Sequence, residues 1–314
     1  MSLPGARRPF LGTAGAQPRD DPAWSYEVKW DGVRVLAAVE AGRDGLTSRL
    51  GNDVTGGYPE LAGLADAIAV PVLLDGEVVA FNAAGVPDFG RLQSRMHVRS
   101  PSAALRASTP VTFVIFDLLC AGGESLLDRT YDERRAALDA IELVGPYWQV
   151  PPAFTGEGAA LVQATRAQGL EGVVAKRRDS RYEPGRRSDC WVKVKHVRRA
   201  SAVVVGWKPG EGGRAGRLGS LLLAVSDGDA LVFAGHVGTG FNAAALTMLA
   251  ERLAPLRRER PALAGVPREH SVVWVEPVLV VDVEFTEWTR DGRLRHPSFK
   301  GLRADLDPGK VVRE

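Results

Sequence analysis

The chain has 314 residues, of which 45% are hydrophobic and 25% are charged, and its formal net charge is +2. This is the composition of an ordinary globular protein, and a chain of this length forms two domains more often than one. It has no apolar run of about 18 residues, so we expect no membrane span. The cysteines, Cys120 and Cys190, lie far apart without metal-ligand spacing, which excludes a structural zinc site and a disulfide scaffold.

The first two-thirds of the chain mixes predicted strands with a few helices. Residues 1–21 are rich in Gly, Pro and Ala and lack a signal-peptide core, so we expect a loose lead-in segment. After it, runs of β-branched and apolar residues predict strands over residues 26–30, 33–39, 71–83, 111–120, 172–177 and 190–195. Helices are expected over residues 58–69, 130–142 and 156–169. Thr130 and Glu133 have the spacing of a capping box. Since strands and helices do not alternate regularly, we expect mixed, largely antiparallel sheets.

The pattern changes near residue 200, where short strands dominate and turn signals separate them. The strands are expected over residues 201–209, 218–227, 230–240, 271–277 and 279–289, and a helix over residues 242–256. Such strands and one helix, within about 110 residues, suit a small barrel of OB type. We therefore predict an α+β fold. Residues 1–199 form a first domain of mixed sheets with flanking helices, and residues 200–314 form an OB-fold β-barrel.

A basic segment precedes this boundary. Residues 176–199, "KRRDSRYEPGRRSDCWVKVKHVRR", hold ten Lys or Arg against three acids, a local net charge of +7 that leaves −5 for the rest of the chain. A solvated charged face is one interpretation of such a run. The interleaved Tyr182 and Trp191 favour another, a partner rich in phosphate such as nucleic acid.

Lys29, in "EVKWDGVR", is the first candidate for chemistry, because an ammonium in a strand that enters the core must be paired or neutralised. Residues i and i+2 of a strand share a face, so Lys193 and Lys195 point the same way and repel unless a polyanion lies between them. Carboxylates such as Glu77 and Glu171 suit Mg²⁺ together with phosphate. A lysine amine crowded by cations loses its proton more readily, and a neutral amine is a nucleophile. Together these lysines and carboxylates predict that the Lys29 amine attacks a phosphorus atom.

Each of these residues also has a plain structural interpretation. Glu77 and Asp117 can be acids at strand ends, and Phe116 can be a core ring. Lys193 and Lys195 can be one exposed strand face. The ordered set across the whole chain decides between the two interpretations, because no single motif is specific.

The set resembles the covalent nucleotidyltransferase superfamily of ATP-dependent DNA ligases and mRNA capping enzymes. It is most similar to the ligase domain of bacterial ligase D and its stand-alone bacterial relatives. The matching stretches, between residues 20 and 306, are "EVKWDGVR", "TSRLGNDVTGGYPEL", "LDGEVVAFN", "PDFGRLQSRM", "FDLL", "LEGVVAKR", "SRYEPGRRSDCWVKVK", "GHVGTGF" and "EWTRDGRLRHPSFKGLR".

The resemblance implies ATP as the cofactor and Lys29 as the residue that takes AMP from it. Glu27 should border the adenine site, and Phe116 should stack on the base. Arg34 and Arg49 should contact the nucleotide and the 5′-phosphate of a nick.

The resemblance also implies a divalent metal, Mg²⁺ or Mn²⁺. Glu77 would bind the ribose or the metal, and Glu171 the metal. Lys193 and Lys195 would hold the α-phosphate, with Arg187 nearby on the phosphate side.

The last motif departs from the family pattern. Arg303 of "FKGLRAD" belongs to an element that orients pyrophosphate, and an acid and a Lys usually follow it. Here Asp305 is present, but Leu306 stands where the Lys is expected, which predicts a slower self-adenylation. Lys300 or Lys310 is a candidate substitute.

By resemblance, then, the chain seals 5′-phosphate/3′-hydroxyl nicks in double-stranded DNA, through lysyl-AMP and adenylated DNA, during DNA repair and recombination including non-homologous end joining. We expect a monomer in the bacterial cytosol.

By analogy its partners would be a separately encoded repair polymerase/primase or Ku. With no helical DNA-binding domain ahead of the core, DNA binding is expected from the core and the barrel. Two alternatives stay open: an RNA ligase or capping-type nucleotidyltransferase, and a non-catalytic nucleic-acid-binding module.

Overall fold

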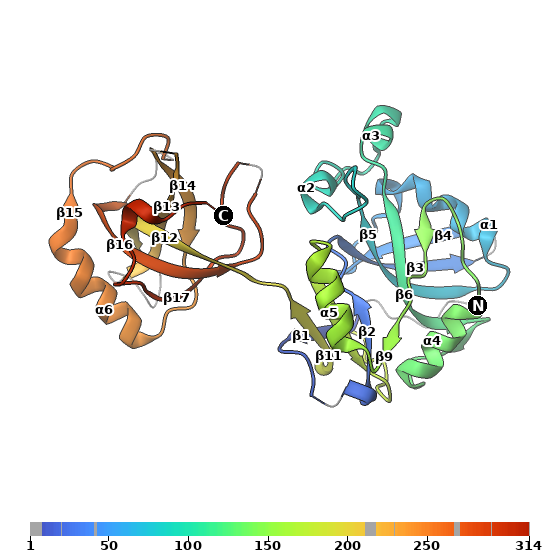
Figure 1. Ribbon diagram of the computed structural model, residues 1–314. Coiled ribbons are helices and arrows are strands. Elements are labelled where there is room, and N and C mark those ends of the chain that lie inside the picture. Colours follow the sequence, from blue (N-terminus) through green and yellow to red (C-terminus); the bar gives the residue numbers. More distant parts are fainter. Residues whose placement is uncertain are drawn as a thin grey trace. The chain divides into compact units, whose positions relative to one another are not determined.

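The computed structural model describes residues 8–19, 21–40, 43–210, 218–228, 230–266, 271–289 and 291–313. It divides into two compact units, residues 1–196 and 197–314, which are described separately (Figure 1). The division lies a few residues before the position 199/200 expected from the sequence. Within the described residues, no helix is long and apolar enough to cross a membrane.

The first unit is built on two sheets, here called sheet A and sheet B (Figure 1). Sheet A has the order β1 (Leu11–Ala14), β11 (Arg187–Lys195), β10 (Gly172–Arg177), β2 (Trp24–Val28) and β9 (Phe154–Thr155). Sheet B has the order β4 (Arg43–Ser48), β3 (Val33–Glu40), β5 (Val72–Val79), β6 (Thr112–Ala121) and β7 (Glu124–Ser125), with β8 (Trp148–Gln149) beside β6. Only β1–β11 and β6–β8 are parallel among the described pairings of this unit. The expected mixed, largely antiparallel sheets are confirmed.

Three apolar layers hold the first unit together. One lies between the two sheets and includes Leu36 of β3, Phe116 of β6 and Trp191 of β11. A larger layer covers the other face of sheet B, beneath α4 (Tyr131–Asp139), the 3₁₀ helix η3 (Pro59–Gly63) and α1 (Leu64–Ala67). On the far face of sheet A, α5 (Gly158–Ala167) packs on Tyr26 and Val173. Two short helices, α2 (Phe89–Leu92) and α3 (Ala103–Ser108), follow β5 in the chain.

Helix α4 shows how local signals and packing agree. The predicted capping box is confirmed: Thr130 Oγ1 accepts from the Glu133 N–H at 3.3 Å, and the Glu133 carboxylate accepts from the Thr130 N–H at 2.8 Å. Arg134 then forms two hydrogen bonds to Asp117 of β6, at 2.8 and 3.0 Å, and both side chains are fully buried. A pair of this kind fixes the helix on the sheet, because removing either partner leaves the other as an unpaired buried charge, which destabilises the fold.

Two expectations for this unit are wrong. The lead-in segment is not loose, since Leu11–Ala14 forms β1 and Phe10 is fully buried. The helix expected over residues 58–69 is instead η3 followed by the single turn α1. Gly63 is the last residue of η3 and directly precedes α1, and the high entropy cost of glycine weakens a continuous α-helix at that point.

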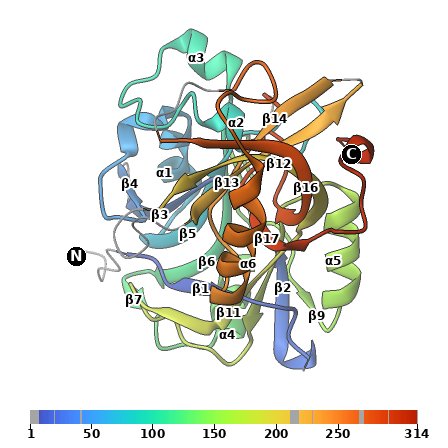
Figure 2. The same cartoon turned by 90° about the vertical axis from the view of Figure 1, so that its left-hand side faces the viewer.

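The second unit is a curled antiparallel sheet, an OB-like half-barrel, with α6 (Ala243–Leu253) across one face (Figure 2). The strand order is β14 (Ala230–Val237), β13 (Leu218–Asp227), β12 (Arg198–Pro209), β16 (Val273–Phe285) and β15 (Arg257–Arg258), with β17 (Ser298–Leu302) beside β16. Leu249 and Leu253 of α6 are buried against the sheet. The fold class expected from the sequence is confirmed.

Strand β16 is one strand where two were expected, over 271–277 and 279–289. Pro277 lies inside it and has no N–H to donate. The pairing with β12 shifts between Trp274 and Leu279, which is an irregularity at the position of this proline. A bulge of this kind lets a strand continue past a residue that cannot join the ladder.

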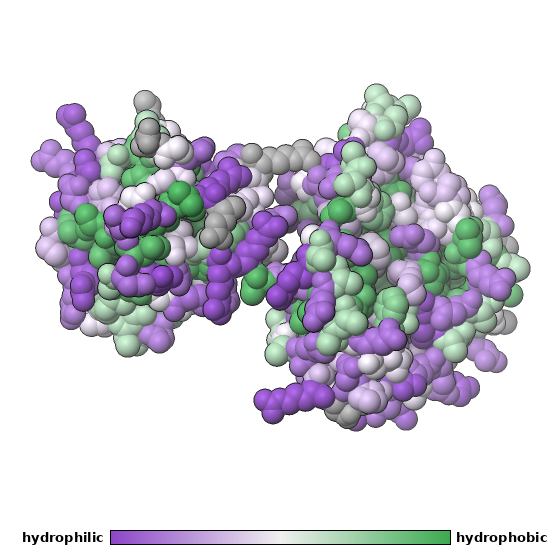
Figure 3. Space-filling view, viewed as in Figure 1, coloured by the Kyte–Doolittle hydropathy of each residue, from purple (hydrophilic) through white to green (hydrophobic). Residues whose placement is uncertain are grey.

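The surface visible in Figure 3 carries hydrophilic side chains over each of the two units, with smaller apolar areas scattered among those side chains. The most exposed large apolar side chains include Leu50, Val144 and Val312, which come from separate parts of the chain. Singly exposed apolar residues of this kind are normal on a protein surface. These scattered apolar residues do not form a candidate site.

Candidate active site

The facing surfaces of sheets A and B carry an unusual number of charged side chains. In sheet B, Val35 of β3 and Leu74 and Val78 of β5 point into the helix-covered core. Because side chains alternate along a strand, the residues beside them, such as Arg34 and Glu77, point toward sheet A. The same alternation in β11 directs Trp191 into the layer between the sheets, and with it Lys193 and Lys195. Charges from both sheets thus converge.

Lys29 directly follows β2, and its backbone N–H donates to the Gly172 carbonyl at 2.9 Å. Its ammonium forms an ion pair with Glu171, which precedes β10. The second oxygen of that carboxylate is 2.9 Å from the Lys195 Nζ. Burial acts to raise the pKa of Glu171, but Lys29 and Lys195 outweigh it and hold this pKa below its usual value. One carboxylate therefore bridges two of the predicted site lysines.

Glu77 lies on the opposite sheet, directly beside Arg34 in the register of β3 and β5. Burial raises its pKa to about 7, against the opposing pull of Arg34 and Lys29. Among the residues that the structure describes, its carboxylate has no hydrogen bond or ion pair. A carboxylate with a raised pKa and no protein partner in that described set, close enough to Lys29 and Glu171 to feel their charges, is a candidate for binding a ligand.

Lys193 is the centre of a group of cations. Burial and, after it, neighbouring positive charges together lower its pKa to about 8. Those charges belong to Lys29, Arg34, Arg49 and Arg187. No acidic partner of Lys193 occurs in the described ranges, although Lys195, two residues on, has one. Neighbouring cations repel one another, and a polyphosphate would relieve the repulsion.

Arg34 is held by protein groups on two sides. Asp75 accepts from its Nε and Nη2 at 2.6 and 2.7 Å, and the Phe10 carbonyl accepts from Nη2 at 3.2 Å. Burial acts to lower the pKa of Arg34, but Asp75 outweighs it, so the guanidinium stays charged. Arg49, by contrast, is exposed on the turn after β4. The expected contacts of both arginines with the nucleotide and the nick stay predictions.

Glu27 and Phe116, the two residues predicted for the adenine side, lie in a buried polar network. Glu27 Oε1 accepts from the Tyr131 hydroxyl and lies 2.8 Å from the Lys176 Nζ. Lys176 also donates to the Phe116 carbonyl at 3.1 Å, and its ammonium is 4.5 Å from the centre of that ring and 4.3 Å from that of Trp191. The Phe116 ring is itself buried, so stacking on adenine stays a prediction.

The carboxylates present suit a divalent metal only in part. Among the described residues, no group of three or more His, Cys, Asp or Glu side chains could hold an ion. Glu77 and Glu171 supply two carboxylates on facing sheets. Mg²⁺ is commonly held by one or two carboxylates, with water and substrate phosphates completing its shell. The site therefore fits a metal that arrives with a nucleotide, and does not fit a preformed protein cage.

The basic segment 176–199 has fewer cations free to bind phosphate than its net charge suggests. Most of its cations already have acidic partners: Lys176 with Glu27, Arg177 with Asp179, Arg178 with Asp132, Arg181 with Asp128, Arg186 with Glu183, Lys195 with Glu171 and Arg199 with Glu284. Arg187, Lys193 and Arg198 are different, because no acidic partner is found for any of them in the described part of the chain. Arg198 begins β12 of the second unit, whereas Arg187 and Lys193 belong to β11, where the two sheets of the first unit meet.

Arg303, the predicted site residue of the second unit, is bound to acids of its own unit. Asp305 accepts from it at 2.8 and 2.9 Å, and Asp282 at 3.3 and 3.4 Å. Leu306 is partly buried and packs against the apolar core of this unit. Lys300, a candidate for the missing cation, is 2.6 Å from Glu284. The role of Arg303 toward pyrophosphate stays a prediction.

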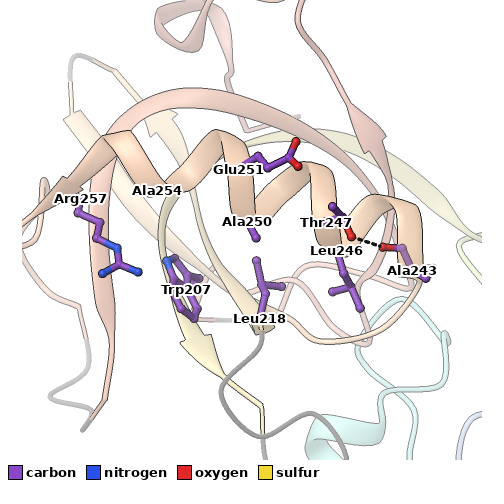
Figure 4. Close-up of a pocket in the computed structure, with 9 residues that line it drawn as sticks. All are labelled: Trp207, Leu218, Ala243, Leu246, Thr247, Ala250, Glu251, Ala254 and Arg257. Atoms are coloured by element: carbon purple, nitrogen blue, oxygen red, sulfur yellow. Dashed lines mark hydrogen bonds between the residues drawn. The ribbon is translucent and has the colours of Figure 1, made fainter.

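The second unit also holds a cavity of about 530 Å³ beneath α6 (Figure 4). Its lining is apolar apart from a few polar groups, and the Trp207 ring lies 6.0 Å from the Arg257 guanidinium. The lining residues are Trp207, Leu218, Ala243, Leu246, Thr247, Ala250, Glu251, Ala254 and Arg257. None of the predicted site residues is among them.

Sequence reasoning assigned no role to several residues that shape the site. Asp117 was interpreted as an acid at a strand end and Lys176 as part of the basic segment. Asp75 was not considered, although it holds Arg34. Tyr182 and Tyr131 donate to buried carboxylates, at Asp75 and Glu27 respectively. A signal was present for Asp75, because it lies two residues before Glu77 and so shares its face of β5.

Comparison with known proteins agrees with this geometry. A family model described as the ATP dependent DNA ligase domain matches residues 16–195, and one described as the ATP dependent DNA ligase C terminal region matches residues 214–306. The first of these covers more than half of the chain. The chain belongs to the family of ATP-dependent DNA ligases, and the family predicted from its motifs is confirmed.

Within that family, the chain is similar to the ligase domain of LigD. The multifunctional non-homologous end joining DNA repair protein LigD of Mycobacterium tuberculosis is 43% identical over 295 residues, which are 93% of this chain and 37% of that protein. The crystal structure of its ligase domain is 39% identical, covers 98% of both chains and has a TM-score of 0.57. A mycobacterial DNA ligase D complexed with ATP and MES is 40% identical over 98% of both chains, also with a TM-score of 0.57. This chain spans less than half the length of full-length LigD.

Proposed function

We propose that this ligase seals nicks between a 5′-phosphate and a 3′-hydroxyl in double-stranded DNA, with Lys29 as its nucleophile. The observation that carries the proposal is the convergence at the meeting of the two sheets. Lys29 is paired to Glu171, Glu171 also holds Lys195, and the unpaired Lys193 lies within their field. A nucleophile beside an acid and a group of unpaired cations is the arrangement that nucleotidyl transfer requires.

The reaction has three transfers. The Lys29 amine attacks the α-phosphorus of ATP, so an N–P bond forms and the bond to pyrophosphate breaks. An oxygen of the DNA 5′-phosphate then attacks the same phosphorus and frees Lys29, which leaves AMP joined to the DNA by a pyrophosphate linkage. Finally the 3′-hydroxyl attacks the 5′-phosphate and displaces AMP. Positioning and charge neutralisation dominate in each step, because each is a displacement at a phosphorus atom that carries charged oxygens.

The surrounding residues divide by what they hold. Lys193 and Lys195, with Arg187 nearby, bind the phosphates, and Arg34 and Arg49 bind the nucleotide and the 5′-phosphate of the nick. Adenine is placed against Phe116 with Glu27 at its edge, and Arg303 orients the departing pyrophosphate.

Glu171 and Glu77 hold a divalent metal, Mg²⁺ or Mn²⁺, with Glu77 alternatively on the ribose. When bound, such an ion polarises the phosphate and offsets its charge. Before ATP binds, Glu171 holds Lys29 in an ion pair.

The repair setting is non-homologous end joining in the bacterial cytosol, where the chain acts as a monomer. The similarity to LigD supports this assignment, since that protein's name places it in end joining. A polymerase/primase or the end-binding protein Ku would then act beside this chain. A pull-down from cell extract, with wild-type chain and with Lys29→Ala as bait, tests whether either protein is retained.

The ligase function itself is tested by mass spectrometry and sealing. Purified protein incubated with ATP should gain one AMP, and the adduct should map to Lys29. With nicked duplex DNA the adduct should disappear and the strand should be joined. Labelling by GTP instead of ATP would identify a capping-type enzyme, and joining confined to nicked RNA would identify an RNA ligase. If the protein gains no AMP and joins no strand, the remaining alternative is a non-catalytic nucleic-acid-binding module.

Leu306 offers a separate test of the first transfer. Lysine can keep the buried stem of leucine against the core while its ammonium reaches water, so Leu306→Lys should fold. We expect it to speed AMP transfer to Lys29 by up to about tenfold, or ~1.4 kcal/mol. Sealing of a nick that already carries AMP should not change, because pyrophosphate has left by then. Leu306→Met is the matched control. Faster sealing without faster AMP transfer would instead place residue 306 against DNA.

A further inference from the structure

The N-terminal strand β1 lies at the edge of sheet A, beside the strand that carries the phosphate-side cations. It pairs in parallel with β11, and its register places Leu11 beside Arg187 and Ala14 beside Lys193. The Gly15 N–H donates to the Lys193 carbonyl at 3.2 Å. The backbone of β11 at both cations is therefore fixed by a segment far away in the sequence.

Phe10, just before β1, anchors this segment. Its side chain is fully buried, with ring centres 5.2 Å from Trp191 and 5.6 Å from Tyr182. Its backbone N–H donates to the Tyr182 hydroxyl at 3.0 Å, and its carbonyl accepts from Arg34 Nη2 at 3.2 Å. Phe10 thus links the N-terminal segment to a site arginine by a backbone group as well as by packing.

These bonds close a ring. The Tyr182 hydroxyl donates to Asp75 Oδ2 at 2.6 Å, and Asp75 accepts from Arg34 in turn. The circuit runs from Phe10 to Tyr182, to Asp75, to Arg34 and back to Phe10. Its four members come from four separate segments, and all but Arg34 are fully buried or nearly so. A ring of satisfied polar groups in a low-dielectric interior is stiff, since each bond restrains the next.

Gly12 makes the second link. Its carbonyl accepts from Arg187 Nη1 at 2.9 Å. A Cβ at this residue would lie 2.5 Å from the Trp191 carbonyl oxygen, which is closer than van der Waals contact allows. The strand approaches β11 so tightly that only glycine fits, and this approach brings the carbonyl within reach of Arg187.

We propose that the segment Phe10–Gly15 is a positioning element of the active site, which holds Arg34, Arg187 and Lys193 in place through its backbone. The inference rests on the proposed function, in which these cations bind phosphate. Like charges at close range push apart. The guanidinium groups of Arg34 and Arg187 each donate to a carbonyl of this segment, and the backbone carbonyl of Lys193 accepts from one of its amides. Phe10 and Gly12 are positioning residues, because they act through the cations and touch no phosphate themselves.

The test compares Phe10→Ala with Leu119→Ala, which truncates another fully buried side chain of the same apolar layer. Single-turnover AMP transfer at saturating ATP is measured well below each melting temperature. We expect Phe10→Ala to slow transfer at least tenfold and Leu119→Ala to stay within threefold of wild type. A second variant, Tyr182→Phe, keeps the ring and removes only the hydroxyl of the circuit, and should slow transfer about fivefold when it is measured well below its own melting temperature.

A double-mutant cycle separates positioning from general stability. In an Arg187→Ala background, one of the cations that Phe10→Ala should displace is already absent. Phe10→Ala should therefore slow AMP transfer by no more than about threefold in that background. Equal effects in both backgrounds, or equal losses in Phe10→Ala and Leu119→Ala, would overturn the inference. So would a wild-type rate in Tyr182→Phe. A wild-type chain that takes up no AMP would instead refute the proposed function.

Discussion

Replacing Lys29 by alanine is expected to abolish the transfer of AMP from ATP. The amine is the only group proposed to bond the α-phosphorus, so nothing replaces it when it is removed. Binding of nicked DNA should persist, since the cations around Lys193 remain. The measurement is labelling of the protein by ATP that carries radioactive phosphorus at the α position, alongside a gel-shift assay with nicked duplex.

Lys29→Arg is the matched control for this prediction. Arginine preserves the positive charge and can still pair with Glu171, but its guanidinium stays protonated and is not a nucleophile. We expect no labelling in this variant either. Labelling that survives in Lys29→Ala would show that another residue takes up AMP, and labelling in Lys29→Arg alone would mean that only the charge is needed.

Removing Lys193 should slow two separate steps. As an unpaired cation among other cations, it is placed to neutralise phosphate charge both when ATP reacts and when the nick is sealed. Loss of one preorganised donor of this kind costs about 10²–10³ in rate. Lys193→Ala should therefore reduce AMP transfer and the sealing of a pre-adenylated nick by roughly that factor, as measured by single-turnover kinetics of each step.

Arg181→Ala controls for net charge, because it removes one positive charge from the same basic segment at an exposed position. We expect it to remain within threefold of wild type in both steps. If Lys193→Ala also stays within about threefold, a difference of roughly 0.7 kcal/mol, then Lys193 does not clamp phosphate. A loss in AMP transfer alone would restrict its role to ATP.

The sequence predicted the site best where the signal was local. Alternation along one strand placed Lys193 and Lys195 on one face. The order of motifs grouped Lys29, Glu171 and Glu77, and in the structure these three side chains interact electrostatically. The boundary signals of α4 also held, because a capping box is complete within four residues.

What the sequence could not predict depends on register and distance. Glu77 lies beside Arg34 only because of how β3 and β5 align, and no local pattern determines that alignment. Phe10 bonds a residue 172 positions away, so a segment rich in Gly and Pro became an ordered strand through partners that its own composition does not reveal. Lys176 stood in a basic run, yet its partner is a buried acid from another strand.

The ion pairs along residues 177–186 determine how this protein should respond to salt. An arginine already neutralised by a neighbouring carboxylate releases few condensed counterions from DNA, because it must exchange one anion for another. Only unpaired cations such as Arg49, Arg187 and Lys193 contribute in full. With about three such contacts, the logarithm of the DNA affinity of the first unit should fall with the logarithm of salt concentration at a slope of roughly −3, far shallower than a basic run with a net charge of +7 suggests.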